Sequence, residues 1–490
     1  MIQGTCSGAG KSLLVAILCR FFRDLGLKVA PFKAQNMSLN SYVSADGGEI
    51  ARAQAFQAFA AGVEPLSIMN PILLKPRGNA ISQVMVLGKP YANLDARSYY
   101  DFVKSIGWRI VAKSLKRLLS MYDLVIIEGA GSPAEINLYD RDIANMRVAE
   151  YAKAPVILVA DIDRGGVFAS IYGTIKLLKP RHRKLVKGII INKFRGDVEL
   201  LMPGIEMLEK NLGVPVLGVV PYIEDLKLPL EDSLSINELT ALRPGRIDVA
   251  IIRLPRISNF TDFEPLRLDP IFSLRLVRDR HDLGKPDVVI IPDTGNIISD
   301  LEWLNENGLA DAIINLRGKA AIIGICGGYQ MLGSKVVDEG VERTRPITIE
   351  GLGLLDVITV FKGRKREVVN VEAEILGHNS LLKHVRARTF RGYMIHVGKT
   401  IRLGDKPAFR VIKPLHKLEG AVKRDEPVIG THIHGLFDEM PLREALAQIK
   451  GYTPMIKGDI WSIWLHELNR IMSIVSSKVD FDYMQKIVFT

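Results

Sequence analysis

Residues 4–12 read Gly4-Thr-Cys-Ser-Gly-Ala-Gly-Lys-Ser12 and lead directly into an apolar run from Leu13 to Phe22. A glycine-rich loop at the start of a helix can cradle phosphate groups, because its backbone N–H groups point toward the ligand. Lys11 is placed to reach the β and γ phosphates of a nucleotide, and the Ser12 hydroxyl to bind magnesium. A glycine-rich turn that only caps a helix is the alternative, and the surrounding sequence favours the phosphate site. The candidate nucleotide-binding residues here are Gly8, Gly10, Lys11 and Ser12.

Short apolar runs alternate with longer amphipathic segments through the first half of the chain, as in buried parallel strands joined by helices. One run, Asp123 to Ile127, leads into Glu128, a carboxylate at the carboxyl edge of a sheet that is suited to hold magnesium. A solvated glutamate at a strand end is the alternative. Only Met1 and Ile2 precede the loop, so we expect a first strand shorter than usual, which fits a natural start upstream. The pattern predicts a doubly wound α/β domain, with further strands in residues 29–32, 155–160, 188–191 and 216–220.

The pattern breaks between Leu226 and Gly245, a polar stretch with proline and glycine that suits a linker. The chain of 490 residues also exceeds the about 250 to 300 residues at which single cores stop growing. A second strand series follows in residues 247–254, 288–291, 320–325 and 430–433. We therefore predict two α/β domains, residues 1–235 and 246–490, with antiparallel additions to the second sheet from residues 350–425.

A predicted buried strand, Ala321 to Ile325, meets Cys326, two glycines and then a helix. This is the pattern of a nucleophile elbow with cysteine in the place of serine. The start of a helix lowers the pKa of a thiol and offers amides to an oxyanion, whereas a lone buried cysteine is usually inert. The base should be a distant histidine, and we choose His434 over His432 because the following Gly435 suggests an exposed strand end. Cys326 and His434 are thus the candidate catalytic pair.

The bulk composition narrows the range of partners. The net charge is +11, but Lys and Arg are spread along the chain and mixed with Asp and Glu, which favours small anionic ligands over nucleic acid. Three scattered cysteines favour a reducing compartment over a disulfide framework or a paired zinc site. The chain has no signal-peptide pattern and no apolar run of about 18 residues. We expect a cytoplasmic protein without a membrane span.

Further ordered motifs are Ala30-Pro-Phe-Lys-Ala-Gln-Asn-Met-Ser-Leu-Asn-Ser41, Glu128-Gly-Ala-Gly-Ser-Pro-Ala-Glu-Ile-Asn-Leu138, Asp161-Ile-Asp-Arg-Gly-Gly-Val-Phe168, Asn192-Lys-Phe-Arg-Gly196 and Arg256-Ile-Ser-Asn-Phe-Thr-Asp262. Together with the Cys326 segment they resemble the adenosylcobyric acid synthase family, from about Met1 to beyond Phe437. The phosphate loop, with five residues between Gly4 and Gly10, is similar to that of dethiobiotin synthetase. The sister family, cobyrinate a,c-diamide synthase, typically has Lys-x-Gly-Pro-Asp-Tyr where this chain has Lys33-Ala-Gln-Asn36.

The resemblance implies a P-loop NTPase-like domain followed by a class I glutamine amidotransferase-like domain. It also implies amidation of the b, d, e and g carboxylates of adenosylcobyrinic acid a,c-diamide, each with one ATP and one glutamine, and magnesium as a cofactor. Asp46 joins Ser12 and Glu128 as an implied magnesium ligand. The implied contacts to nucleotide or substrate are Lys33, Gln35, Asn36, Asn40, Lys75, Asn192 and Lys193. A homo-oligomer is compatible with the sequence, which leaves the oligomeric state open.

Three positions depart from the expected patterns. Leu436 stands where class I glutaminases often carry a glutamate that orients the histidine, so we infer a Cys–His pair and name no third member. Asp293 stands where the family usually has glycine, close to the expected oxyanion hole, and Met394 where it usually has glutamate. An acidic side chain near developing negative charge is unfavourable unless it points away. We therefore expect a slow or tightly gated glutaminase.

Three rival hypotheses stay open at this point. One is a related glutamine-dependent amidoligase, such as cobyrinate a,c-diamide synthase or an enzyme acting on another macrocycle, because motifs locate chemistry better than they identify a substrate. A second is a nucleotide-dependent switch, which would not need the Cys326 elbow. The third is a noncatalytic second domain, which Asp293 and Met394 motivate and the Cys326 and His434 pair opposes.

Overall fold

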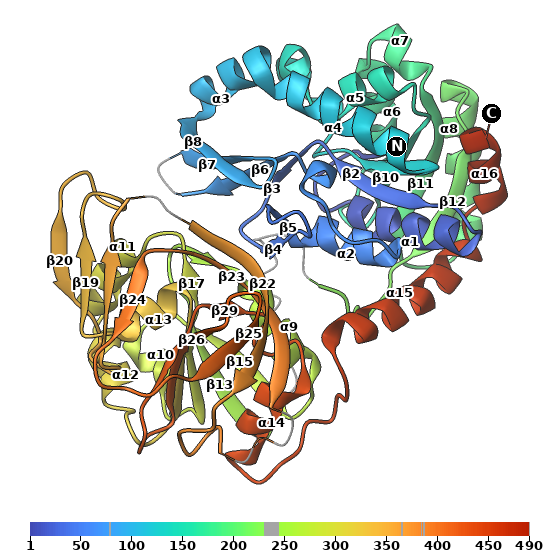
Figure 1. Ribbon diagram of the computed structural model, residues 1–490. Helices are drawn as coiled ribbons and strands as arrows, with labels where there is room; N and C mark the ends of the chain where they lie inside the picture. The colour runs from blue at the N-terminus through green and yellow to red at the C-terminus, as the bar shows by residue number, and fades with distance from the viewer. Residues whose placement is uncertain (78–79, 230–244, 364–365, 384, 386–387, 490) are drawn as a thin grey trace.

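The computed structural model describes residues 1–77, 80–229, 245–363, 366–383, 385 and 388–489. Two α/β units lie beside each other, and the end of the chain returns to the first unit (Figure 1). Most of the predicted linker between Leu226 and Gly245 lies outside the described residues. Across the described ranges, no helix combines the length and the apolar character that crossing a bilayer requires.

The first unit is built on a six-stranded parallel sheet in the order β12-β11-β10-β1-β9-β2. The strands are β1 (Ile2–Gly4), β2 (Val29–Lys33), β9 (Leu124–Glu128), β10 (Val156–Asp161), β11 (Val186–Phe194) and β12 (Val216–Pro221). Although β1 has only three residues, it pairs with β9 and with β10. Both faces of the central strands are covered, which explains their nearly continuous apolar sequences. The predicted doubly wound parallel sheet is confirmed.

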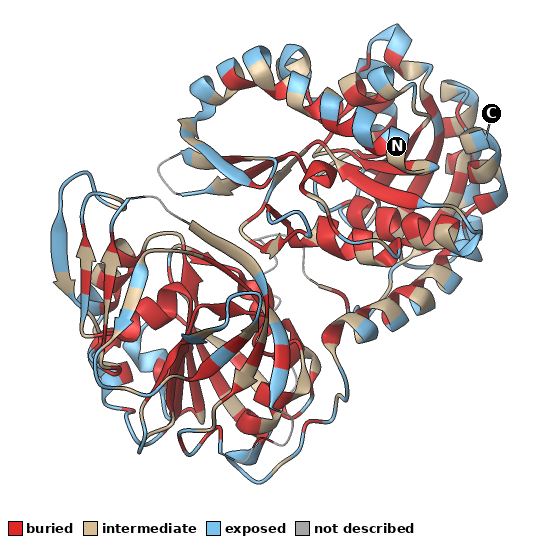
Figure 2. Cartoon of the chain, in the orientation of Figure 1, coloured by how far each residue is buried: buried red, intermediate tan, exposed pale blue. Residues whose placement is uncertain are grey.

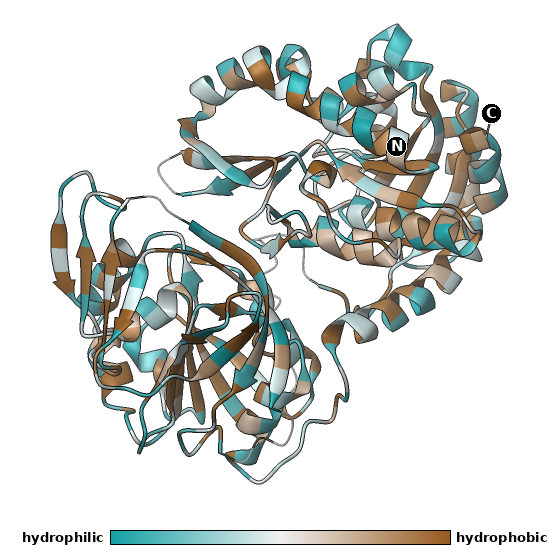
Figure 3. Ribbon diagram, in the orientation of Figure 1, coloured by the Kyte–Doolittle hydropathy of each residue, from teal (hydrophilic) through white to brown (hydrophobic). Residues whose placement is uncertain are grey.

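Helices cover both faces of this sheet, because alternate residues of a strand point to opposite sides. Ile157 and Val159 of β10 pack in one core with helix α1, whereas Leu158 and Ala160 pack in another with α6 and α8. The helices of this unit are α1 (Lys11–Asp24), α2 (Arg52–Ala60), α3 (Ala96–Phe102), α4 (Trp108–Met121), α5 (Met146–Ala152), α6 (Val167–Leu177), α7 (Pro180–Arg183) and α8 (Met202–Leu212). Figure 3 shows the strands of the sheet largely in hydrophobic colours and the outer helical surfaces with much more teal.

A smaller sheet projects from the first unit toward the second (Figure 1). It has four strands in the order β3-β6-β7-β8, and a separate two-stranded ribbon, β4-β5, lies beside it. The sequence analysis did not predict these elements. They are β3 (Gln35–Met37), β4 (Ser41–Val43), β5 (Glu49–Ala51), β6 (Ile72–Pro76), β7 (Ile81–Val86) and β8 (Lys89–Asp95).

The second unit has its own six-stranded sheet in the order β15-β13-β16-β18-β28-β27, parallel except for β27 at one edge. The strands are β13 (Ile247–Ile252), β15 (Phe272–Val277), β16 (Val288–Ile291), β18 (Ala321–Ile325), β27 (Ala421–Val422) and β28 (Val428–Thr431). The helices of this unit are α9 (Glu264–Leu268), α10 (Arg280–Leu283), α11 (Ile297–Glu306), α12 (Leu309–Ile314), α13 (Gly327–Leu332) and α14 (Met440–Gln448). Figure 2 shows this sheet as a continuous buried layer, which confirms a second α/β unit.

Most of the antiparallel strands in residues 350–425 do not extend the central sheet, so that part of the prediction is wrong. Among the described residues of this range, only the two-residue β27 joins it. The others pair among themselves in sheets ordered β20-β19-β21-β24 and β26-β25-β22-β23-β29. The two longest of these strands, β22 and β23, pair with each other along nearly their whole length. Their backbone groups on that side are therefore not available to pair with the central sheet. The strands are β19 (Lys335–Asp338), β20 (Ile347–Glu350), β21 (Val357–Phe361), β22 (Arg366–Ile375), β23 (Thr389–Val397), β24 (Lys399–Arg402), β25 (Phe409–Lys413), β26 (Lys417–Glu419) and β29 (Ile433–His434).

The last two helices, α15 (Ile460–Ser476) and α16 (Phe481–Phe489), pack against the first unit. Trp464 and Leu468 of α15 are fully buried in the same core as Val15 of α1. The Phe481 ring lies 4.7 Å from the Phe21 ring, measured between centroids. The predicted range 246–490 for the second domain thus includes a terminal segment that belongs to the first core.

Candidate active sites

Hydrogen bonds fix the shape of the phosphate loop between β1 and α1. The Lys11 ammonium donates hydrogen bonds to the carbonyls of Cys6 (2.8 Å) and Gly131 (3.2 Å). Gly10 has φ of +97°, and a Cβ there would lie 2.2 Å from Nδ2 of Asn192, so only glycine fits. The Asn192 amide in turn donates to the carbonyl of Ala9 at 2.8 Å. The structure therefore brings Asn192, from the end of β11, directly onto the predicted loop.

Glu128 is fully buried at the end of β9 and is surrounded by donors. Its Oε1 accepts hydrogen bonds from the Ser12 hydroxyl (2.7 Å) and the Lys33 ammonium (2.5 Å), and its Oε2 from the Gln57 amide (2.6 Å). Burial by itself raises the pKa of the Glu128 carboxyl, but the Lys33 charge and these hydrogen bonds bring it below its ordinary value. An ionised carboxylate and a hydroxyl side by side are the oxygen donors that magnesium prefers, so Ser12 and Glu128 fit this ion.

Asp46 occupies a different environment from the other two predicted magnesium ligands. Its carboxylate accepts hydrogen bonds from the Ser67 amide (3.0 Å) and hydroxyl (2.6 Å) and from the Ser44 hydroxyl (2.5 Å). Within the described ranges, no hydrogen bond or ion pair joins Asp46 to Ser12 or Glu128. Its contacts are those of a residue that fixes the start of the 3₁₀ turn at Ser67–Met69.

Two predicted contact residues also lie near the phosphate loop. The Lys193 ammonium donates to the carbonyl of Gly8 and to Oδ2 of Asp161, both at 2.8 Å. The Asn36 amide donates to Oε1 of Gln54 at 2.8 Å, and the Gln54 amide lies 3.4 Å from Oε2 of Glu128. Sequence reasoning assigned no role to Gln54 and Gln57. Their signal was the pair of glutamines three residues apart on the alanine-rich helix α2.

Gln35 faces a cavity of about 630 Å³ at the carboxyl edge of the first sheet. Its Oε1 accepts a hydrogen bond of 2.6 Å from the Tyr99 hydroxyl, and both residues line the cavity. Gly131, whose carbonyl accepts from Lys11, also lines it. A ligand in this cavity would therefore lie next to the phosphate loop.

Cys326 lies between β18 and α13 in the strained turn that its sequence predicts. Its φ is +52°, a conformation uncommon for residues other than glycine. A Cβ at Gly328 would lie 1.9 Å from the carbonyl oxygen of Ile291, so the turn also needs a residue without a side chain there. The backbone thus presents the thiol at the start of a helix, the arrangement of a nucleophile elbow.

His434 ends strand β29 and is held by a third residue. Its Nδ1 lies 2.7 Å from Oδ2 of Asp262, and the other oxygen of Asp262 accepts from the Gly435 amide at 2.9 Å. Burial lowers the pKa of the His434 imidazole, but Asp262 more than offsets this, and the net shift is upward. Asp262 thus occupies the position of the third member that the sequence left unnamed.

The orienting carboxylate was missed because it was sought two residues after the histidine. It comes instead from the turn Phe260–Phe263, far upstream, at the end of the motif that begins at Arg256. The expected exposure of the histidine is also wrong, because His434 is fully buried. His432 has both ring nitrogens engaged, with Glu419 at 3.0 Å and Thr400 at 3.1 Å. These contacts fit a structural role for His432.

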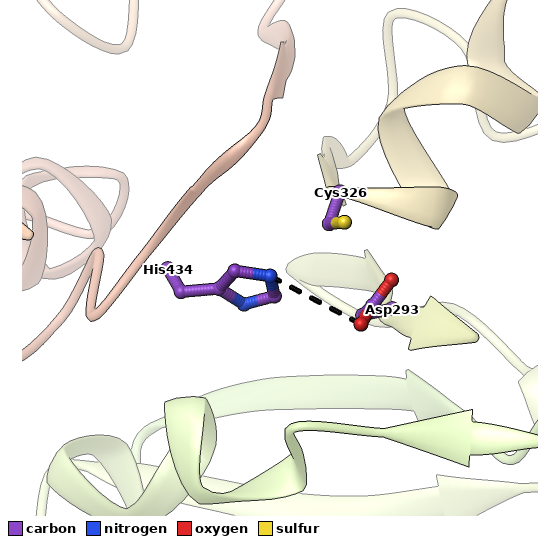
Figure 4. Close-up of side chains that lie close together, drawn as sticks. All are labelled: Asp293, Cys326 and His434. Carbon is purple, nitrogen blue, oxygen red and sulfur yellow. Dashed lines mark ion pairs between the residues drawn. The ribbon is translucent and has the colours of Figure 1, made fainter. Parts of the chain in front are cut away.

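Asp293 lies close to Cys326 and His434, and its carboxylate faces the His434 ring (Figure 4). Its Oδ1 accepts a hydrogen bond of 3.1 Å from the amide of Gly327. That amide follows the nucleophile and is the one expected to stabilise an oxyanion. Its Oδ2 lies 4.0 Å from Nε2 of His434. The Asp293 carboxylate therefore points toward the expected oxyanion hole and not away from it. In this position its negative charge is unfavourable for an oxyanion.

The carboxylate also affects the thiol. Burial raises the pKa of the Cys326 thiol well above its ordinary value, and the adjacent Asp293 raises it further. Burial raises the pKa of Asp293 itself, but His434 and the hydrogen bond from Ser258 bring it below its ordinary value. These shifts favour a protonated Cys326 thiol beside an ionised Asp293 carboxylate.

Comparison with known proteins decides the family. Residues 1–236 match the model of the CobQ/CobB/MinD/ParA nucleotide binding domain, and residues 248–442 that of the CobB/CobQ-like glutamine amidotransferase domain. The chain is 49% identical over 452 residues to "Cobyric acid synthase" of Pelotomaculum thermopropionicum, covering 91% of this chain and 86% of that protein. It is 46% identical over 500 residues to "Probable cobyric acid synthase" of Methanothermobacter thermautotrophicus, covering 100% and 98%.

The chain belongs to the cobyric acid synthase family. Members of this family are ligases of cobalamin synthesis, and this chain has both a nucleotide-binding unit and a glutamine amidotransferase unit. It also fits the order of the two sites along the sequence, with the phosphate loop first and Cys326 second.

In this member of the cobyric acid synthase family, a cavity of about 620 Å³ lies between the two units. Cys326 and Asp293 line it from the second unit, and Lys75 and Gln83 line it from the first. Asn259 connects the units next to it, since its Oδ1 accepts from the Ser41 amide (3.0 Å) and its Nδ2 donates to Asp293 (2.9 Å). Asn259 therefore links Asp293 to the first unit beside this cavity.

Proposed function

We propose that this protein uses ATP and glutamine to amidate the b, d, e and g carboxylates of adenosylcobyrinic acid a,c-diamide, giving adenosylcobyric acid. The observation that carries the proposal is the presence in one chain of a phosphate loop with a buried carboxylate and of a Cys–His–Asp set. Neither site alone requires the other. Together they would supply the two halves of a glutamine-dependent amidation, and the cavity between the units borders the Cys326 site.

In the first half-reaction, a substrate carboxylate oxygen attacks the γ-phosphorus of ATP, and ADP leaves. The product is an acyl phosphate, from which ammonia displaces phosphate to form the amide. The loop amides and Lys11 would bind and orient the β and γ phosphates. Ser12 and Glu128 would hold magnesium, which neutralises phosphate charge when bound. Asn192 and Lys193 lie against the loop and would fix its shape around the nucleotide.

In the second half-reaction, the Cys326 sulfur attacks the carboxamide carbon of glutamine. His434, oriented by Asp262, takes the thiol proton and passes it to the departing ammonia. Water then hydrolyses the thioester, releasing glutamate and restoring the thiol. Before this attack, Asp293 must leave the Gly327 amide so that the developing oxyanion can accept its hydrogen bond.

The test is mass spectrometry of adenosylcobyrinic acid a,c-diamide after incubation with purified protein, magnesium-ATP and either glutamine or ammonium. We expect four successive amidations with glutamine. Cys326→Ala should lose amidation with glutamine and keep it with ammonium. Failure with both nitrogen sources in the wild-type protein would reject this corrinoid as the substrate.

A related corrinoid substrate is the alternative, because the family models also describe CobB-like domains. The same assay with cobyrinic acid distinguishes the two. Amidation of cobyrinic acid at the a and c positions alone, with none of the a,c-diamide, would assign the sister activity instead.

A further inference from the structure

We propose that Cys326, His434 and Asp293 form a binding site for a single soft divalent cation of the zinc type. One ligand atom from each of these residues lies within 4.8 Å of the other two. The set combines a thiol sulfur, an imidazole nitrogen and a carboxylate oxygen, all of which are zinc ligands in proteins. Figure 4 shows the three side chains converging on one point.

The histidine has the arrangement of a metal ligand. Its Nδ1 is fixed by the Asp262 carboxylate at 2.7 Å, which leaves Nε2 as the nitrogen directed toward Cys326 and Asp293. Nε2 is fully buried, and no described residue hydrogen-bonds to it. Metal-binding histidines commonly have their other nitrogen held by a carboxylate in this way, because the contact sets the ring orientation and makes the imidazole more basic.

The carboxylate is also held in place. Oδ2 of Asp293 accepts hydrogen bonds from the Ser258 hydroxyl (2.7 Å) and the Asn259 amide (2.9 Å), and lies 4.0 Å from Nε2 of His434. Ligand atoms in a tetrahedral zinc site lie about 3.3–3.7 Å apart, given bonds of about 2.0–2.3 Å. Side-chain movements of about 1 Å would therefore bring the three atoms to bonding distance.

The site has an entrance and an open position. Cys326 and Asp293 line the cavity between the two units, so a cation can enter from there and keep a fourth ligand such as water. On binding, the Cys326 thiol releases its proton to solvent and its sulfur bonds the metal. If the proposed glutaminase function holds, an occupied site has no free nucleophile, and the cation switches off glutamine use while leaving ammonium use intact.

The binding test uses Co²⁺ as a spectroscopic probe, titrated into the metal-free full-length protein. We expect one equivalent to bind with a sulfur-to-cobalt charge-transfer band that Cys326→Ser abolishes. Asp293→Gly should weaken binding at least about 10-fold, because it removes one of three ligands. Cys19→Ala is the matched control, since that thiol lies in the core of helix α1, and should leave the band unchanged.

Absence of the band in the wild-type protein would overturn the proposal, as would its persistence in Cys326→Ser. Equal affinity in Asp293→Gly and wild type would also overturn it, because the carboxylate would then not be a ligand. These outcomes do not depend on catalysis. If the cation binds as proposed but the protein lacks glutaminase activity, the function fails and the metal site stands.

Discussion

The two reactive sites differ in how their surroundings suit their chemistry. In the first unit, the buried carboxylate of Glu128 accepts hydrogen bonds from the Lys33 ammonium, the Ser12 hydroxyl and the Gln57 amide. In the second unit, the carboxylate of Asp293 lies beside the buried thiol of Cys326. It raises the thiol pKa and accepts a hydrogen bond from the Gly327 amide. The first site is complementary to its ligand in advance, and the second must rearrange.

Under the proposed function, this difference means that the two half-reactions would start from different levels of readiness. A hydrolysis that releases ammonia without an acceptor wastes glutamine, whereas a prepared nucleotide site carries no such cost. Asp293 is held by Ser258 and Asn259, two consecutive residues, and Asn259 also contacts Ser41 of the first unit. This segment is therefore positioned to relate the state of the first unit to the state of the thiol.

The largest expected effects come from removing one key residue at each site, and they differ in which nitrogen source they affect. Cys326→Ala should reduce glutamine-dependent amidation by about 10⁴-fold or more, because no other group replaces the nucleophile. Lys11→Ala should reduce amidation with both nitrogen sources, because it removes a phosphate contact. Initial rates with glutamine and with ammonium measure both effects. Loss of ammonium use in Cys326→Ala, in a protein that unfolds at the wild-type temperature, would contradict the separation.

Asp262→Asn should come next, with a decrease of about 10²- to 10⁴-fold in glutamine hydrolysis. An amide cannot stabilise the charged imidazole of His434, although it can occupy the same volume. The expected rate with ammonium is unchanged, and this rate serves as the control. Equal loss with both nitrogen sources would show that Asp262 supports the whole structure and not the histidine.

The contact between the units should depend on Glu49, a fully buried residue paired with Lys75 of the first unit and Arg366 of the second. Burial raises its pKa, but Arg366 and Lys75 lower it to about 2 from an ordinary value of 4.5. Because the folded-state pKa is lowered, the contribution is fully present above about pH 4.5 and is lost as the pH falls toward 2. At pH 7, Glu49→Gln should lower the free energy of unfolding by about 3 kcal/mol.

Urea unfolding at pH 7 and pH 3 measures this difference, which should shrink at the lower pH. Glu350→Gln is the matched control, because its ion pair with Lys335 is exposed, and it should change the free energy of unfolding by less than about 0.5 kcal/mol. A pH-independent difference for Glu49→Gln would mean that the charge of Glu49 does not stabilise the contact.

The central sheets and the two loops were predictable because each follows from a local pattern. In two short runs, the local sequence is enough to indicate a turn and the strand or helix next to it. These runs are Gly4 to Ser12 and Ala321 to Gly328. The missed features depend on distant parts of the chain. Asp262 lies 172 residues before His434. Helix α15, near the end of the chain, packs in one core with α1, near its start. No periodicity or spacing encodes such contacts, because they arise only when the units pack.

The direction of Asp293 was also beyond the sequence. Its identity raised the question of an obstructed oxyanion hole, but the answer depends on the hydrogen bonds from Ser258 and Asn259 that aim the carboxylate at the thiol. Asp46 shows the reverse case. The family resemblance implied a magnesium ligand at this position, which stays a prediction, and in the folded chain the Asp46 oxygens accept hydrogen bonds from Ser44 and Ser67.

The most direct test of the contrast between a prepared and an obstructed site is glutamine hydrolysis by Asp293→Gly without ATP or corrinoid. A chelator in the assay excludes any effect of a bound cation, and Asp293→Asn serves as a variant of equal size without the charge. We predict hydrolysis about 10- to 100-fold faster than wild type for Asp293→Gly, because the Gly327 amide becomes available and the thiol pKa falls. A rate equal to or below that of wild type would contradict the account.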